Sequence, residues 1–103
     1  MHDLIDQRRA EIAVLCRRHG VRRLEVFGSA ARGADFDPAV SDADFLVDFE
    51  PGSGQFPLEQ FFGLAEALEH LLGRTVDLLE PGAIKNPFVL AGINRAREIV
   101  YAP

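Results

Sequence analysis

Two aspartates, Asp42 and Asp44, have the spacing in this chain that most clearly indicates chemistry. In a β-strand, residues i and i+2 point to the same face, with their Cα atoms about 6.5 Å apart. Carboxylate oxygens at that separation can share divalent cations. A third carboxylate, Asp77, lies in the middle of another expected strand. Because clustered carboxylates repel one another, a cation bound among the three best explains such a cluster.

A Gly-Ser pair upstream of the aspartates could bind phosphate. Gly28 and Ser29 follow an expected strand and precede a short helical turn over residues 30–32. Glycine lets the backbone approach a triphosphate, and the serine hydroxyl and nearby N–H groups can bind its oxygens. Arg32 either neutralises phosphate or pairs with a carboxylate to fix the turn, and both interpretations stay open. Together with a pair of metal ions, these groups are suited to nucleotidyl transfer.

The elements that must position these residues follow from the spacing of apolar side chains. Residues 42–49 alternate strictly, with Ala43, Phe45 and Val47 on one face and the aspartates on the other. Similar patterns predict strands near residues 22–28, 42–49 and 74–80, a short edge strand near 98–101, and helices near 3–19, 57–72 and 87–96. A mixed sheet flanked by helices is therefore expected.

Residues 26–33 (VFGSAARG) and 41–47 (SDADFLV), followed by Val76-Asp77-Leu78, closely resemble the signature of the DNA polymerase β-like nucleotidyltransferase superfamily. The nearest match is its minimal branch, the minimal nucleotidyltransferase (MNT) domains. The resemblance covers most of the chain, because the other expected elements also occur in the order that family shows. It implies an α+β fold with a small mixed β-sheet, and a single minimal nucleotidyltransferase domain over residues 1–103.

The same resemblance implies a role for each matching residue. Asp42 and Asp44 would bind two Mg²⁺ ions, and Asp77 would complete the carboxylate triad and activate the acceptor hydroxyl. Gly28 and Ser29 would contact the triphosphate of ATP, and Arg32 is counted with them as a nucleotide-binding residue. Since these roles come from the family, the spacing of the residues alone does not establish them.

The resemblance also implies a partner. Larger enzymes of this superfamily append domains that bind the acceptor, and 103 residues leave no room for them. The chain resembles MNT antitoxins paired with a HEPN-domain toxin, whose family activity is transfer of AMP from ATP to a tyrosine of the toxin. An alternative is an inactive antitoxin that acts by binding alone, since Ala30 to Ser41 make twelve intervening residues, about two more than is usual in such antitoxins. A subunit that modifies a small molecule is a third possibility.

Composition narrows the other options. Eleven Lys and Arg residues against 16 Asp and Glu residues give a net charge of −5, which disfavours binding to duplex DNA or to an anionic membrane. The N-terminus has no apolar signal segment, and the apolar runs fall short of the ~20 residues of a membrane span, so a cytoplasmic protein is expected. The single cysteine, Cys16, has the helical spacing of a buried structural thiol.

Other candidate residues have simpler interpretations. Asp35 and Asp37 precede Pro38 in a loop-like segment, so a solvated turn is expected. Asp48 shares the acidic face of its strand but lies further along, so solvation is expected there too. A set of aromatic and aliphatic residues in the second expected helix is most simply core: Leu58, Phe61, Phe62, Leu68 and Leu72. If Phe56, Phe62 or Phe88 lies at the surface, it could instead dock a partner.

Overall fold

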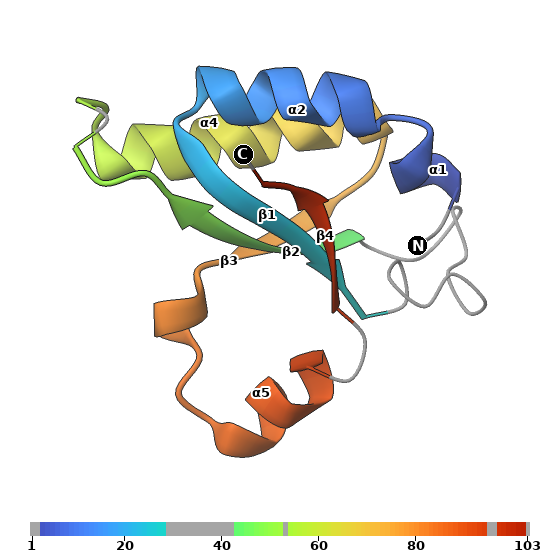
Figure 1. Ribbon diagram of the computed structural model, residues 1–103, viewed down its shortest axis with the longest axis vertical. Helices are drawn as coiled ribbons and strands as arrows, with labels where there is room; N and C mark the ends of the chain where they lie inside the picture. Colours follow the sequence, from blue (N-terminus) through green and yellow to red (C-terminus); the bar gives the residue numbers. More distant parts are fainter. Residues whose placement is uncertain (1–2, 29–42, 53, 95–96, 103) are drawn as a thin grey trace.

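A four-stranded sheet forms the centre of the structure, a computed structural model that describes residues 3–28, 43–52, 54–94 and 97–102. The strands are β1 (Val21–Phe27), β2 (Ala43–Phe49), β3 (Val76–Leu79) and β4 (Arg97–Tyr101). They lie in the order β3-β2-β1-β4 (Figure 1). β1 is antiparallel to β2 and to β4, whereas β2 is parallel to β3. The expected mixed sheet is therefore confirmed, with β3 and β4 at its edges.

Two helices, α2 (Arg9–Arg18) and α4 (Pro57–Leu72), pack against each other over one face of this sheet (Figure 1). The alternation expected for the strands is confirmed, because Leu24, Val26, Phe45 and Val47 are all fully buried on that face. Helix residues complete the core beneath them: Ile5, Ile12, Cys16, Leu64, Leu68 and Leu72. The acidic residues of β2 consequently lie on the opposite face of the sheet, which we call the open face.

The single helix expected over residues 3–19 is wrong in one respect. The structure has a short α1 (Asp3–Asp6) and then α2, which starts at Arg9. Between them the N–H of Arg8 donates to the carbonyl of Ile5 at 3.1 Å, a tight i to i−3 turn that interrupts the α-helical ladder. The apolar pattern could not reveal this break, because no large apolar side chain occurs between Ile5 and Ile12 to report the phase of the helix.

The helix expected over residues 57–72 is confirmed as α4. Pro57 occupies its first turn, and Gly73 ends it in the left-handed conformation with φ 68°. The buried Gln60 donates to the carbonyl of His19 at 2.8 Å and so ties α4 to the end of α2. Only part of the expected apolar stripe of α4 is core: Leu64, Leu68 and Leu72 are buried, whereas Leu58 and Phe62 are 73% and 62% exposed.

The chain then leaves the sheet and returns to it. A short 3₁₀ turn, η1 (Pro81–Ala83), leads to α5 (Pro87–Asn94), which extends away from the α2 and α4 layer (Figure 1). The expected cap is confirmed, because the Oδ1 of Asn86 accepts the N–H of Phe88 at 2.9 Å. The last strand begins at Arg97, slightly before the expected residue 98. Within the described parts of the chain, no helix is long and apolar enough to cross a bilayer.

Cys16 is expected to be unreactive in the folded protein. Its side chain is fully buried in α2, and burial raises the pKa of the thiol to about 12, against a small opposing effect of Arg17. Because the thiolate is the reactive form, a disulfide reagent added at pH 8 should label Cys16 only at the rate of unfolding. Labelling of native protein as fast as of protein in denaturant would contradict this burial.

Candidate active site on the open face of the sheet

The open face carries a row of four register partners across the whole sheet. Asp77 on β3 pairs with Asp44 on β2, Asp44 pairs with Phe27 on β1, and Phe27 pairs with Arg97 on β4. Side chains that face one another across neighbouring strands point to the same side of a sheet. The row therefore brings together two acidic side chains, the last residue of β1 and one cation from distant parts of the sequence.

Asp44 and Asp77 are adjacent in space although 33 positions separate them in the sequence, counted from 44 to 77. Neighbouring strands lie about 4.8 Å apart, which sets the separation of their Cα atoms. Asp77 is exposed and Asp44 is half-buried, so both carboxylates lie where a ligand could reach them. Two adjacent carboxylate donors are the oxygen ligands that Mg²⁺ prefers. The donor set on the open face therefore fits a divalent cation.

Of the expected carboxylate triad, the structure describes Asp44 and Asp77. Asp42, Ser29 and Arg32 lie outside the described residues, as do Asp35 and Asp37. Within the described ranges there is no group of three or more potential metal-ligating side chains. Asp48, which shares the strand and face of Asp44, is exposed as expected. The structure thus brings together Gly28, Asp44 and Asp77 from the set predicted by sequence.

Gly28 lies in close contact with the side chain of Asp44. It has φ 68°, a left-handed conformation that side chains other than glycine rarely adopt. A Cβ atom built on Gly28 would lie 2.8 Å from the Oδ2 atom of Asp44, well inside van der Waals contact. The carboxylate of Asp44 therefore rests against the backbone at the end of β1. Any ligand bound to that carboxylate would also lie beside the backbone that continues into Ser29.

Sequence reasoning missed the ion pair next to this row. Glu25 is only 5% exposed and faces the open side of β1. Arg97 donates to both of its carboxylate oxygens at 2.7 Å, and the Nε of Arg23 lies 3.0 Å from Oε1. The alternation of β1 placed Glu25 on this face, but the expected elements left Arg97 between the last helix, near 87–96, and the edge strand, near 98–101, so the pair had no visible signal. The ion pair links β4 to β1 at Glu25, three residues before Gly28.

The hydrogen bonds from Arg97 lower the pKa of Glu25 below its ordinary value of 4.5, although burial alone would raise it. A carboxylate with a lowered pKa stabilises the fold above its unfolded-state pKa and loses that contribution as the pH falls through the folded-state value. Glu25→Gln should therefore reduce the free energy of unfolding by about 2 kcal/mol at pH 7. The difference from wild type should shrink below about pH 4.5.

Urea denaturation at several pH values tests this expectation. Glu11→Gln is the matched control, because Glu11 pairs with Arg8 at 3.1 Å on the exposed surface of α2. Such a pair contributes at most about 0.5 kcal/mol. Equal losses for Glu25→Gln and Glu11→Gln at pH 7 would show that the buried pair does not stabilise β4 against β1.

Comparisons with known proteins agree with this geometry. Residues 11–100 match the nucleotidyltransferase domain family. The chain is similar to the protein adenylyltransferase MntA of Thermococcus cleftensis, with 42% identity over 85 residues that make up 82% of this chain and 77% of that protein. It is also similar to a solved structure described as a minimal nucleotidyltransferase, with 36% identity, a TM-score of 0.73 and 95% of each chain covered.

The likeness of the fold extends further. The structure superposes with a TM-score of 0.63 and 16% identity on a chain of a complex between a tri-AMPylated Shewanella oneidensis HEPN toxin and an MNT antitoxin. That superposition covers 96% of this chain and 73% of the other. At this identity the likeness concerns the fold alone. The family match over residues 11–100 and the closer relatives decide the identity: the chain belongs to the nucleotidyltransferase domain family, as one of its minimal nucleotidyltransferases.

Proposed function

We propose that this chain transfers AMP from ATP, with Mg²⁺, to a tyrosine hydroxyl of a HEPN-domain toxin and thereby acts as its antitoxin. The observation that carries the proposal is the placement of the Asp44 carboxylate between the Gly28 backbone and Asp77. Two relatives support the acceptor, since one is named protein adenylyltransferase and the other is an MNT antitoxin bound to a tri-AMPylated HEPN toxin. The whole of residues 1–103 would act as one catalytic domain.

Each residue of the site then has a task. Asp44 and Asp77, with Asp42, would hold two Mg²⁺ ions, and Gly28, Ser29 and Arg32 would bind the triphosphate. The ions supply charge neutralisation for the attacking oxygen and the leaving pyrophosphate. Asp77, the more exposed of the two described carboxylates, would accept the proton of the acceptor hydroxyl. The tyrosine oxygen forms a bond to the α-phosphorus, the bond to the β-phosphate oxygen breaks, and pyrophosphate leaves.

The open face explains why the acceptor is proposed to be a protein. Asp77 lies on the edge strand β3 and is exposed, so a bulky acceptor can approach it from the side of the sheet. We also expect the reaction to take place in the cytoplasm, where ATP is available.

The phosphate that is transferred tests this proposal. We expect ATP labelled at the α-phosphate to label the HEPN partner protein in the presence of Mg²⁺. ATP labelled at the γ-phosphate should leave it unlabelled, because pyrophosphate is the leaving group. Tandem mass spectrometry should locate the label on tyrosine. Transfer of the γ-label, or no label from either donor, would overturn the proposed reaction.

A further inference from the structure

An apolar groove lies between the first half of α4 and the edge strand β3. Its volume is about 330 Å³, and its lining includes Pro57, Leu58, Phe61, Phe62, Leu79 and Ala83. The Phe61 and Phe62 rings meet edge to face, with centroids 5.4 Å apart and an interplanar angle of 87°. Two large apolar side chains of α4 and one of β3 are thus left in contact with solvent, which is typical of a docking site.

The groove reaches the edge strand that carries Asp77, through Leu78, Leu79 and Glu80. Leu79 lies two positions after Asp77 on β3, and both are exposed on the strand while Val76 and Leu78 are buried. Since a strand advances about 3.3 Å per residue, the two Cα atoms lie about 6.6 Å apart on one face. A protein seated over Leu79 would therefore present its neighbouring side chains to Asp77 and Asp44. A larger groove of about 610 Å³, lined by residues of α2 and α4 such as Val14 and Leu71, lies on the helical layer instead.

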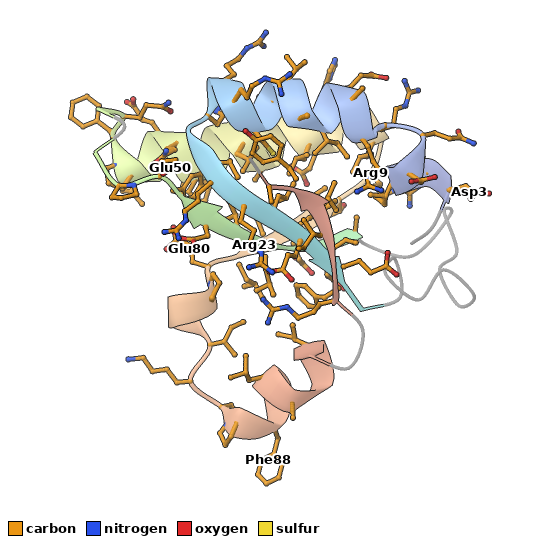
Figure 2. All side chains as sticks on the ribbon, viewed as in Figure 1. Asp3, Arg9, Arg23, Glu50, Glu80 and Phe88 are labelled. Carbon is orange, nitrogen blue, oxygen red and sulfur yellow. The ribbon has the colours of Figure 1, made fainter. Side chains whose placement is uncertain are left out.

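The negative charge around the groove favours a basic partner. Glu80 lines it, and among the described residues no Lys or Arg does so. Glu59 is exposed beside Leu58, and Glu50 and Glu80 line an adjoining hollow together with Pro57. Figure 2 shows Glu50 and Glu80 on the same side of the molecule. A second copy of this chain, with its net charge of −5, would place like charges against one another, whereas a basic partner would be attracted.

We propose that this groove docks the HEPN partner through an apolar helix flanked by Lys and Arg residues, next to the tyrosine that accepts AMP. The inference rests on the proposed function for the identity of the partner. Leu58 and Phe62, one turn apart on α4, are the anchor residues of the groove. They pack against the apolar stripe of the partner helix. Glu59 and Glu80 form ion pairs with the Lys and Arg residues that flank this stripe. Docking at the groove supplies affinity for the partner, and the carboxylates perform the transfer.

Truncating both anchors tests the groove. In Leu58→Ala/Phe62→Ala, the dissociation constant for the HEPN protein measured by calorimetry should rise by about a hundredfold, and the KM for that protein should rise with it. The kcat at saturating partner and the rise in melting temperature caused by Mg²⁺ and ATP should stay unchanged. Phe88→Ala is the matched control, because Phe88 is 86% exposed on α5 and points away from the body of the molecule (Figure 2). Its affinity for the partner should equal that of wild type.

The outcomes separate this inference from the proposed function. If wild type binds the HEPN protein without modifying it, the proposed reaction fails while the loss of affinity still tests the groove. If the double variant binds as tightly as wild type, the docking site is overturned even where transfer is observed. Absence of binding by wild type overturns it as well. A dimer of wild type in light scattering that the double variant lacks would show that a second copy occupies the groove, which also contradicts the proposal.

Discussion

Asp44→Asn is expected to lower the rate of AMP transfer by at least about a thousandfold while the protein stays folded. Asparagine keeps the shape of the side chain but removes the charge that would hold Mg²⁺, a contribution of several kcal/mol to the transition state. The fold should persist because Asp44 lies on the open face, whereas the neighbouring Phe45 and Ala43 supply the core. Initial rates of label transfer and circular dichroism measure the two effects.

Asp48→Asn is the control for this change. Asp48 lies on the same strand and face as Asp44, but it is exposed at the far end of β2 and is paired with Arg23 on β1 rather than with Phe27. It removes the same charge from the protein and should leave the rate within about twofold, because long-range charge effects are screened. Mg²⁺ and ATP should raise the melting temperature of this control as they do for wild type. If Asp44→Asn transfers AMP as fast as Asp48→Asn, Asp44 has no part in the reaction.

The second large effect is expected for Gly28→Ala, which should reduce the rate by about a hundredfold. The added methyl group would lie 2.8 Å from the Oδ2 atom of Asp44, so the carboxylate must move. Displacement of a reacting group by about 1 Å is enough for such a loss. Alanine at φ 68° also costs about 1 kcal/mol in stability.

Gly52→Ala separates the two consequences. Gly52 has φ 73°, so alanine there suffers the same backbone strain, but its Cβ would have no atom within 4 Å. We expect Gly28→Ala and Gly52→Ala to lose similar amounts of stability in urea denaturation, while only Gly28→Ala loses activity. Equal activities in the two variants would mean that the contact with Asp44 does not position the carboxylate for catalysis.

The strands could be predicted from the sequence because each has one face on the core. Ala43, Phe45 and Val47 alternate with polar residues, and this alternation directly assigns Asp44 to the open face. The adjacency of Asp44 and Asp77 could not be obtained in that way, because β2 and β3 are parallel and α4 separates them in the chain. The family resemblance predicted that both aspartates belong to one site, and the parallel register of β2 and β3 shows that they are adjacent.

Two features had no local signal. The pair between Glu25 and Arg97 depends on β4 returning to β1, a contact between residues 72 positions apart in the sequence. The exposure of Leu58 and Phe62 arises because they lie to one side of the buried row of α4, although they belong to the same broad apolar stripe in the sequence. That row consists of Gln60, Leu64, Leu68 and Leu72. Periodicity identifies the apolar face of a helix, but only tertiary packing decides which part of that face is covered.

The intact mass of the HEPN partner, measured after denaturing separation from this chain, tests the central claim most directly. Incubation with wild type, ATP and Mg²⁺ should add one or more AMP masses to the partner, and incubation with Asp44→Asn should add none. Denaturation removes every non-covalent contact, so only a covalent mark survives to be weighed. An unchanged mass, from a mixture in which the toxin was fully inhibited, would contradict the account and show that the chain neutralises its partner by binding alone.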